Sequence, residues 1–200
     1  KIAADLKHEW IFKSLDNGLF LKNVESVVEL SFGGALYYGL AHGKSLFDLL
    51  NFDNLGIVHT GQLGDVVVGT FYSSLDCNKA SSLKDGAYST ALTYKLPENL
   101  LSKEYENEEI FKFYTRCFSG ANQGLLPLQE ITETYSPFYD IDFMEYCLSL
   151  PVKMRFEHKI YHKWILKKYP KAAQYVWEKI GTTIDHPQIK LLGKSFPLKK

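Results

Sequence analysis

One carboxylate, Asp65, lies at the end of a short polar turn between two apolar segments. The apolar residues 55–58 precede the turn of residues 60–64, and residues 66–68 begin a second apolar segment. This order is typical of a buried strand, a tight loop and the start of a helix. Ligands of open α/β sheets lie at the carboxyl ends of strands, where such loops gather. The stretch therefore indicates either a ligand-binding loop or an ordinary strand–turn–helix joint in which Asp65 caps the helix.

The elements that would position this loop are mostly helices. Apolar residues at helical spacing predict helices over residues 106–118, 122–132, 140–150, 161–168 and 171–180. Asp140 is placed to cap the third of these helices. Aromatic and branched residues predict a short strand over residues 8–12, whereas residues 181–200 show no clear periodicity. The expected fold class is α/β and mostly helical, with few parallel strands.

Composition excludes several classes of protein. Hydrophobic residues make up 46% of the chain and aromatic residues 14%, which is typical of a packed globular protein. The net charge of zero argues against a dedicated nucleic-acid binder. No apolar run approaches the ~20 residues that a membrane-spanning helix needs, and no signal-peptide pattern opens the chain. We therefore expect a cytoplasmic protein with no nucleic-acid partner and no membrane partner.

The cysteines support a reducing compartment. Their number is odd, they are widely separated and none forms a C-x-x-C pair. Each is predicted to be a small buried hydrophobic residue. The three are Cys77, Cys117 and Cys147.

Three separated segments resemble, in the same order, motifs of the asparagine synthetases. Residues 60–65, Thr-Gly-Gln-Leu-Gly-Asp, followed by Gly69, resemble the family's S-G-E-G-x-D-E-x-F-G-G-Y loop. Residues 133–140 resemble its E-x-R-x-P-F-L-D segment, and residues 163–167 resemble its K-x-x-L-R helix. The resemblance extends over about residues 8–180. It implies a C-terminal synthetase domain of the ATP-pyrophosphatase, adenine nucleotide alpha hydrolase-like type.

That resemblance implies a partial Rossmann-like nucleotide domain completed by a helical C-terminal half. We expect residues 1–96 to be an incomplete α/β nucleotide-binding part and residues 97–200 to be the helical part of the same synthetase domain. The family's phosphate-binding loop, S-G-G-x-D-S, has no counterpart here, because residues 31–35 share only its glycines. We therefore expect a fragment that is inactive alone and lacks an N-terminal segment of the same chain.

The activity that the resemblance implies is ATP-dependent amide formation, a C–N ligase reaction through an acyl-adenylate. The parent would resemble a glutamine-hydrolysing asparagine synthase, with ATP and Mg²⁺ as cofactors. Its partners would be a small-molecule carboxylate and an ammonia donor, and self-association is compatible with the sequence. The alternative is a non-catalytic, asparagine-synthetase-like scaffold or partner-binding domain.

The resemblance also implies roles for particular residues. Asp65 matches the family's metal-binding aspartate, and Mg²⁺ commonly takes one or two carboxylates with phosphate oxygens completing its shell. Lys163 matches the lysine that stabilises charge during adenylation. Its alternative role is that of one solvated cation among the twelve of residues 151–200, where acids number three. The implied cofactor-binding positions are Thr60, Gly61, Gly64 and Lys167.

Departures from the family pattern favour the alternative function. Gln62 stands where the family has a glutamate; an amide cannot accept a proton from an amine, although it can contact substrate through hydrogen bonds. Val66 replaces an acidic residue and Tyr135 replaces an arginine. Lys167 replaces an arginine and loses its bidentate fork.

A zinc site is not favoured. His158 and His162 are spaced i, i+4, but two histidines alone do not make the four-ligand set of a structural zinc site.

Overall fold

The computed structural model describes residues 1–34, 43–76, 91–178, 180–186, 188–192 and 194–198. Up to residue 101 the elements, with η for 3-10 or π turns, are α1 (Ile2–Asp5), η1 (Asp16–Asn23), α2 (Val24–Leu30), η2 (Phe52–Asn54), β1 (Val58–His59), η3 (Val66–Thr70), η4 (Thr93–Lys95) and α5 (Glu98–Leu101). The following elements are α6 (Glu108–Lys112), η5 (Phe113–Phe118), η6 (Ala121–Leu125), α7 (Leu126–Gln129), β2 (Thr134–Tyr135), η7 (Pro137–Tyr139) and α8 (Ile141–Ser149). The last are α9 (Val152–Arg155), η8 (Phe156–His158), α10 (Lys159–Lys168), η9 (Ala172–Gln174), β3 (Gln188–Leu191) and β4 (Lys194–Pro197).

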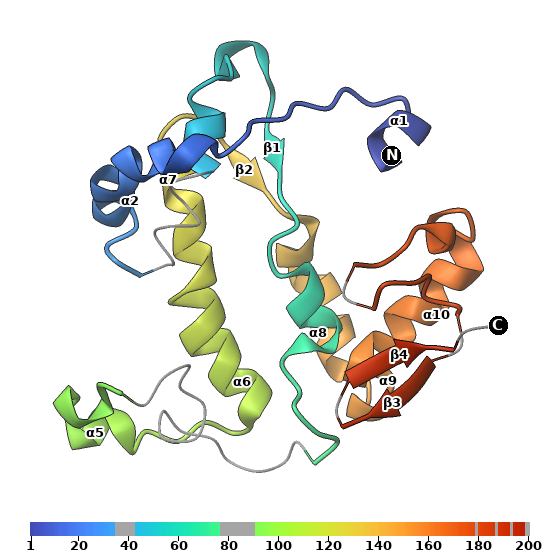
Figure 1. Ribbon diagram of the computed structural model, residues 1–200. Helices are drawn as coiled ribbons and strands as arrows, with labels where there is room; N and C mark the ends of the chain where they lie inside the picture. Colours follow the sequence, from blue (N-terminus) through green and yellow to red (C-terminus); the bar gives the residue numbers. More distant parts are fainter. Residues whose placement is uncertain (35–42, 77–90, 179, 187, 193, 199–200) are drawn as a thin grey trace.

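A short parallel pair of strands lies in the upper middle of the view (Figure 1). β1 pairs with β2 in the register Val58↔Thr134 and His59↔Tyr135. The amide of Thr60 extends the ladder by donating to the Tyr135 carbonyl at 2.8 Å. Each strand leads through a loop into a helical segment, η3 after β1 and α8 after β2, and these two segments pack together. The order of strand, turn and helix over residues 55–72 and the mostly helical α/β composition are thus confirmed. The expected burial of the strand is wrong, because β1 has only two residues and Leu55 and Ile57 are 50% and 52% exposed.

The main hydrophobic core lies between η3, η5 and α8. The Phe71 and Phe113 rings meet edge to face with centroids 5.3 Å apart. Burial of one such side chain contributes about 1.5–3 kcal/mol. The buried members are Leu63, Val66, Val67, Phe71, Phe113, Cys117 and Cys147.

The prediction of buried, unpaired cysteines is confirmed for Cys117 and Cys147. Burial, together with the charge of Asp65, raises the pKa of the Cys117 thiol to about 11. Cys77 lies outside the described residues.

Four of the five predicted helices are present. They correspond to α6 with η5, η6 with α7, α8, and α10. Asp140 caps α8, since its carboxylate accepts from the Phe143 amide at 2.8 Å. The predicted helix over residues 171–180 is wrong, because only the short turn η9 forms there. Trp177 instead bridges to Thr182, donating its amide to the Thr182 carbonyl at 2.9 Å.

The predicted strand over residues 8–12 is also wrong. This segment is irregular, with the Trp10 side chain 73% exposed and its ring 5.7 Å from that of Phe12. The β3–β4 hairpin, which the sequence analysis did not anticipate, pairs Ile189 with Phe196 in antiparallel register. Among the described residues, no helix is both long and apolar enough to cross a membrane.

A buried ion pair joins α6 to α9. Arg155 is 2% exposed and Glu109 is 3% exposed. The guanidinium donates to both carboxylate oxygens of Glu109, from Nη1 at 2.5 Å and from Nη2 at 3.0 Å. The Tyr72 hydroxyl donates to the same carboxylate and accepts from Arg155 Nη2 at 2.6 Å. Three distant parts of the chain thus meet in one buried polar cluster.

Close backbone contact between η3 and the junction of α9 with η8 depends on Gly69. Its φ is +114°, a conformation that side chains rarely adopt. A Cβ at this position would lie 2.4 Å from the carbonyl oxygen of Arg155. Only glycine allows the two segments to approach this closely.

A second charged cluster lies beside the buried ion pair. Lys112 pairs with the Glu108 carboxylate and donates to the Phe71 carbonyl at 2.8 Å. Ser73 donates to Glu108 Oε2 from its amide at 3.0 Å and from its hydroxyl at 2.7 Å. Burial alone would raise the pKa of Glu108, but the hydrogen bonds from Lys112 and Ser73 outweigh it and leave that pKa below its ordinary value of 4.5.

The Glu108→Gln variant is expected to lose about 1–3 kcal/mol of unfolding free energy at neutral pH. Because the folded-state pKa of Glu108 is lowered, its contribution is present above pH 4.5 and disappears as the pH falls below that value. Urea denaturation of both proteins at pH 7 and pH 3.5 measures the difference. Glu104→Gln, at an exposed position, is the control and should show little difference at either pH. An equal difference between wild type and Glu108→Gln at both pH values would contradict the assignment.

Candidate functional site

The loop that connects β1 to η3 is held by the segment that follows β2. The Ser136 hydroxyl donates to the Gln62 carbonyl at 2.7 Å. The Phe138 ring lies so close to Gly64 that a Cβ there would be 2.7 Å from ring atom Cε2. Glycine at position 64 therefore allows the aromatic ring to pack on the loop. The first two segments singled out in the sequence are thus in direct contact.

The Asp65 carboxylate is exposed and does not cap the helix. Its backbone is already helical, with φ −72° and ψ −38°, and its side chain forms no capping hydrogen bond. The alternative in which Asp65 is an N-cap is therefore wrong. Within the described part of the chain, no hydrogen bond or ion pair engages this carboxylate.

Asp65 opens onto a cleft of about 1420 Å³. One wall is the loop and the residues just after it, namely Gly61, Gly64, Asp65 and Val68. A second wall is one face of α10 together with the residue before it, namely His158, Tyr161, His162, Ile165 and Lys168. The segment that follows α10 and the N-terminal helix α1 complete the cleft. The Tyr175 hydroxyl, which donates to Asp5 at 2.8 Å, joins these last two parts.

Three of the predicted site residues, Gly61, Gly64 and Asp65, line this cleft. Thr60 lies at the start of the same loop, and its Oγ1 is buried with no hydrogen-bond partner among the described residues. A Cβ on Gly61 would meet nothing within 4 Å, so a ligand could approach the backbone there. Gln62 points elsewhere: its side-chain amide donates to the Ala121 carbonyl at 2.8 Å.

The two predicted lysines of α10 do not line the cleft. Lys163 and Lys167 are exposed. Tyr161, Ile165 and Lys168 share the cleft-facing side at three- and four-residue spacing, which turns Lys163 away from it. The helix cation at the cleft is therefore Lys168, which the sequence analysis did not single out. The sequence could have identified Lys168, because it lies three residues after Ile165 and residues at this spacing share one face of a helix.

A ring cluster lies where α10 begins. The Trp177 ring contacts those of His158 and His162, with centroids 6.1 Å and 5.3 Å away. The Thr70 hydroxyl lies 2.7 Å from His158 Nε2, which links η3 to η8 just before α10. Burial lowers the pKa of His162, so this imidazole is neutral at pH 7.

The donor set suits a metal that arrives with a nucleotide. Across the described residues, no group of three or more His, Cys, Asp or Glu side chains could hold a metal ion. Asp65 contributes one carboxylate group, which is exposed at the cleft. Mg²⁺ is commonly bound by one or two carboxylates plus substrate phosphates rather than by an all-protein cage. The residues thus fit Mg²⁺ bound jointly with phosphates.

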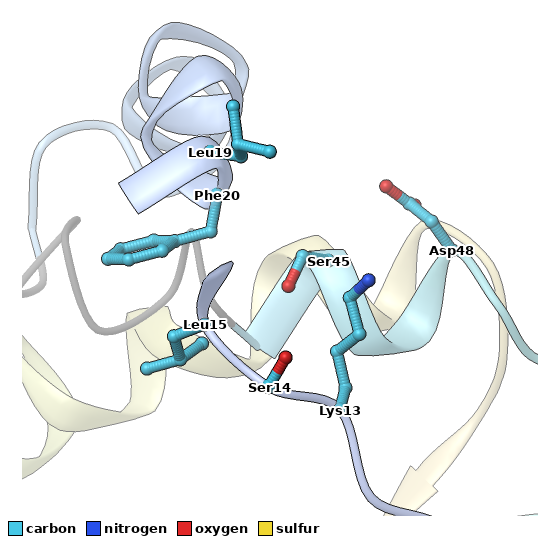
Figure 2. Close-up of a pocket in the computed structure, with 7 residues that line it drawn as sticks. All are labelled: Lys13, Ser14, Leu15, Leu19, Phe20, Ser45 and Asp48. Atoms are coloured by element: carbon cyan, nitrogen blue, oxygen red, sulfur yellow. The ribbon is translucent and has the colours of Figure 1, made fainter. Parts of the chain in front are cut away.

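A smaller hollow of about 230 Å³ lies between the N-terminal segment and the helical turn at residues 43–47 (Figure 2). Lys44 pairs with Asp48 across one turn at 2.6 Å beside it. It contains none of the predicted site residues. Its lining residues are Lys13, Ser14, Leu15, Leu19, Phe20, Ser45 and Asp48.

Comparison of the chain with family models, with curated proteins and with solved structures finds no match. The large cleft and the loop at its edge are therefore the features from which a function is inferred.

Proposed function

We propose that the chain is the C-terminal part of an ATP-dependent C–N ligase that forms an amide through an acyl-adenylate. The observation that carries this proposal is the free Asp65 carboxylate, which follows a parallel strand and opens onto the cleft. The segment of residues 133–140, which resembles a second asparagine synthetase motif, packs directly on that loop. Residues of α10, which contains the third motif, form the facing wall.

The finer fold proposal is a partial Rossmann-like nucleotide domain. β1 and β2 are parallel, and each leads through a loop into a helical segment. In such sheets, nucleotides bind outside the carboxyl ends of the strands. The loop of residues 60–65 and the turn of residues 136–140 both lie at that edge.

The side chains then have the following roles. Asp65 would hold Mg²⁺, which would supply neutralisation of the phosphate charge. The backbone at Gly61 receives the nucleotide, and Lys168 offsets the charge that develops as the substrate carboxylate displaces pyrophosphate from the α-phosphate. Ammonia then attacks the acyl carbon and AMP departs. His162, a neutral imidazole in the cleft, is placed to accept the proton that the amine releases.

ATP–pyrophosphate exchange by the full-length parent tests the proposal. Asp65→Asn is expected to lower exchange by about 10²–10³-fold, because it removes the ligand that positions charge compensation at the phosphates. Asp142→Asn, at an exposed position of α8, is the matched control and should leave exchange unchanged. Lys168→Ala should lower exchange by about tenfold or more, and Lys163→Ala should not, because only Lys168 lines the cleft.

Two outcomes would contradict this assignment. Loss of exchange in Lys163→Ala but not in Lys168→Ala would restore the role that the resemblance implies for Lys163. Absence of exchange with every carboxylic acid, in a folded protein, would favour the non-catalytic scaffold. One observation supports that second function: the Gln62 amide is committed to the Ala121 carbonyl and so fixes the loop instead of facing the cleft.

A further inference from the structure

The walls of the large cleft are apolar and aromatic beyond the loop at Asp65. Ile165 and Tyr169 contribute from α10 and its end, and Trp177 contributes from the segment that follows. Val68 and Phe138 extend the apolar lining from the opposite wall, next to Gly64. Clefts of this kind bind ligands through their apolar bodies, while a few polar groups set the orientation.

The charged groups of the cleft are few and mostly cationic. Its lysines are Lys1, Lys168 and Lys171, and its carboxylates are Asp5 and Asp65. Asp5 already accepts the hydrogen bond from Tyr175. The cleft therefore offers cations to an anionic group of a ligand, next to a large apolar surface.

Neither arginine of the chain lines the cleft. Arg155 is buried in its pair with Glu109, and Arg116 lies in η5. Bidentate recognition of a second carboxylate by guanidinium is therefore absent from the described cleft. A short dicarboxylate could pair with the cleft lysines, but it would leave the apolar surface of Ile165, Tyr169 and Trp177 uncovered.

We propose that the cleft binds a monocarboxylic acid with a bulky alkyl or aryl body, not a short dicarboxylate such as aspartate. The inference rests on the proposed function, since it names the acyl substrate of the same site. The carboxylate lies toward Lys168, and the body lies against Ile165, Tyr169 and Trp177.

Fluorescence titration of the 200-residue chain with decanoate tests this proposal. Decanoate should produce a saturable change in tryptophan emission, and aspartate should produce none. Trp177→Phe should remove most of the change, whereas Trp10→Phe, in the exposed segment of residues 8–12, should retain it.

Two α10 variants separate the cleft from the rest of the helix. Ile165→Asp should weaken decanoate binding at least about tenfold, since it places an unpaired charge against the apolar body of the ligand. Leu166→Asp, one residue along and outside the cleft, is the matched control and should bind as the wild type does. If Ile165→Asp fails to fold by circular dichroism, Ile165→Ala replaces it, with an expected loss of about tenfold.

Equal binding of aspartate and decanoate, or equal effects of Ile165→Asp and Leu166→Asp, would overturn the inference. The two proposals fail separately. Decanoate binding without ATP–pyrophosphate exchange in the parent would refute the ligase but keep the ligand class. Exchange with aspartate and not with decanoate would refute the ligand class but keep the ligase.

Discussion

Gly69→Ala is expected to lose at least about 3 kcal/mol of unfolding free energy, or to prevent folding at 37 °C. Two costs combine in this variant. A residue with a side chain would be held at φ +114°, which costs of order 1–3 kcal/mol. Its Cβ would also lie 2.4 Å from a backbone oxygen of Arg155, so η3 and η8 would have to separate at a typical cost of about 1–3 kcal/mol.

Gly56→Ala is the control for this prediction. A Cβ on Gly56 meets nothing within 4 Å and its φ is not in the left-handed region, so its unfolding free energy should change by less than about 0.5 kcal/mol. Chemical denaturation of the three proteins measures both effects. Equal stabilities for the Gly56 and Gly69 variants would show that η3 and η8 do not pack as described.

Arg155→Met is expected to lose about 3–5 kcal/mol, because it leaves the Glu109 carboxylate buried without its cation. That carboxylate is 3% exposed and would retain only the Tyr72 hydroxyl as a partner in this cluster. Lys153→Met, in the same helix α9 but exposed, should change stability little. Urea denaturation of each variant at pH 7 gives the comparison.

The double variant Arg155→Met with Glu109→Leu distinguishes a true ion pair from two independent losses. Replacing a buried ion pair by apolar residues of similar volume is often neutral or stabilising. The double variant should therefore recover most of the stability that Arg155→Met loses. A double variant as unstable as the sum of both single variants would contradict the coupling.

Local signals in the sequence were sufficient for elements whose ends are set by nearby residues. Asp140 and Pro151 bracket α8, and the observed helix ends where those residues require. Its buried face is not set by such local signals, since Tyr146 is 63% exposed although it lies beside the buried Cys147. Which side of a helix is covered depends on its neighbours, and those are known only from the fold.

The strand propensity of a segment did not by itself predict whether that segment forms a strand. Residues 8–12 are rich in aromatic and branched side chains, but no strand in the described part of the chain pairs with their backbone groups. β3 and β4 have a partner in each other, and they form in a segment without an obvious pattern. Whether a short segment forms a strand therefore depends on pairing with a neighbouring strand more than on its composition.

The candidate site was predicted in part. The loop at Asp65 was found from its residue types, and the structure places Gly61 and Gly64 beside it on the cleft. The facing cation could not be found in the same way, because the choice between Lys163 and Lys168 depends on how α10 is rotated about its axis. The roles of Lys163, Lys167 and Gln62 remain predictions.

The parallel pairing of β1 with β2 has a consequence for how the chain is made. Val58 and Thr134 are 76 positions apart, so β1 has no partner until β2 has left the ribosome. At roughly 5–20 residues per second, translation of that interval takes about 4 to 15 s. Among the core neighbours of the apolar residues that follow β1, Phe113 and Cys117 are made late in this interval, and Cys147 is made only after it. The nascent chain is therefore most open to chaperone binding, or to aggregation, before α8 is complete.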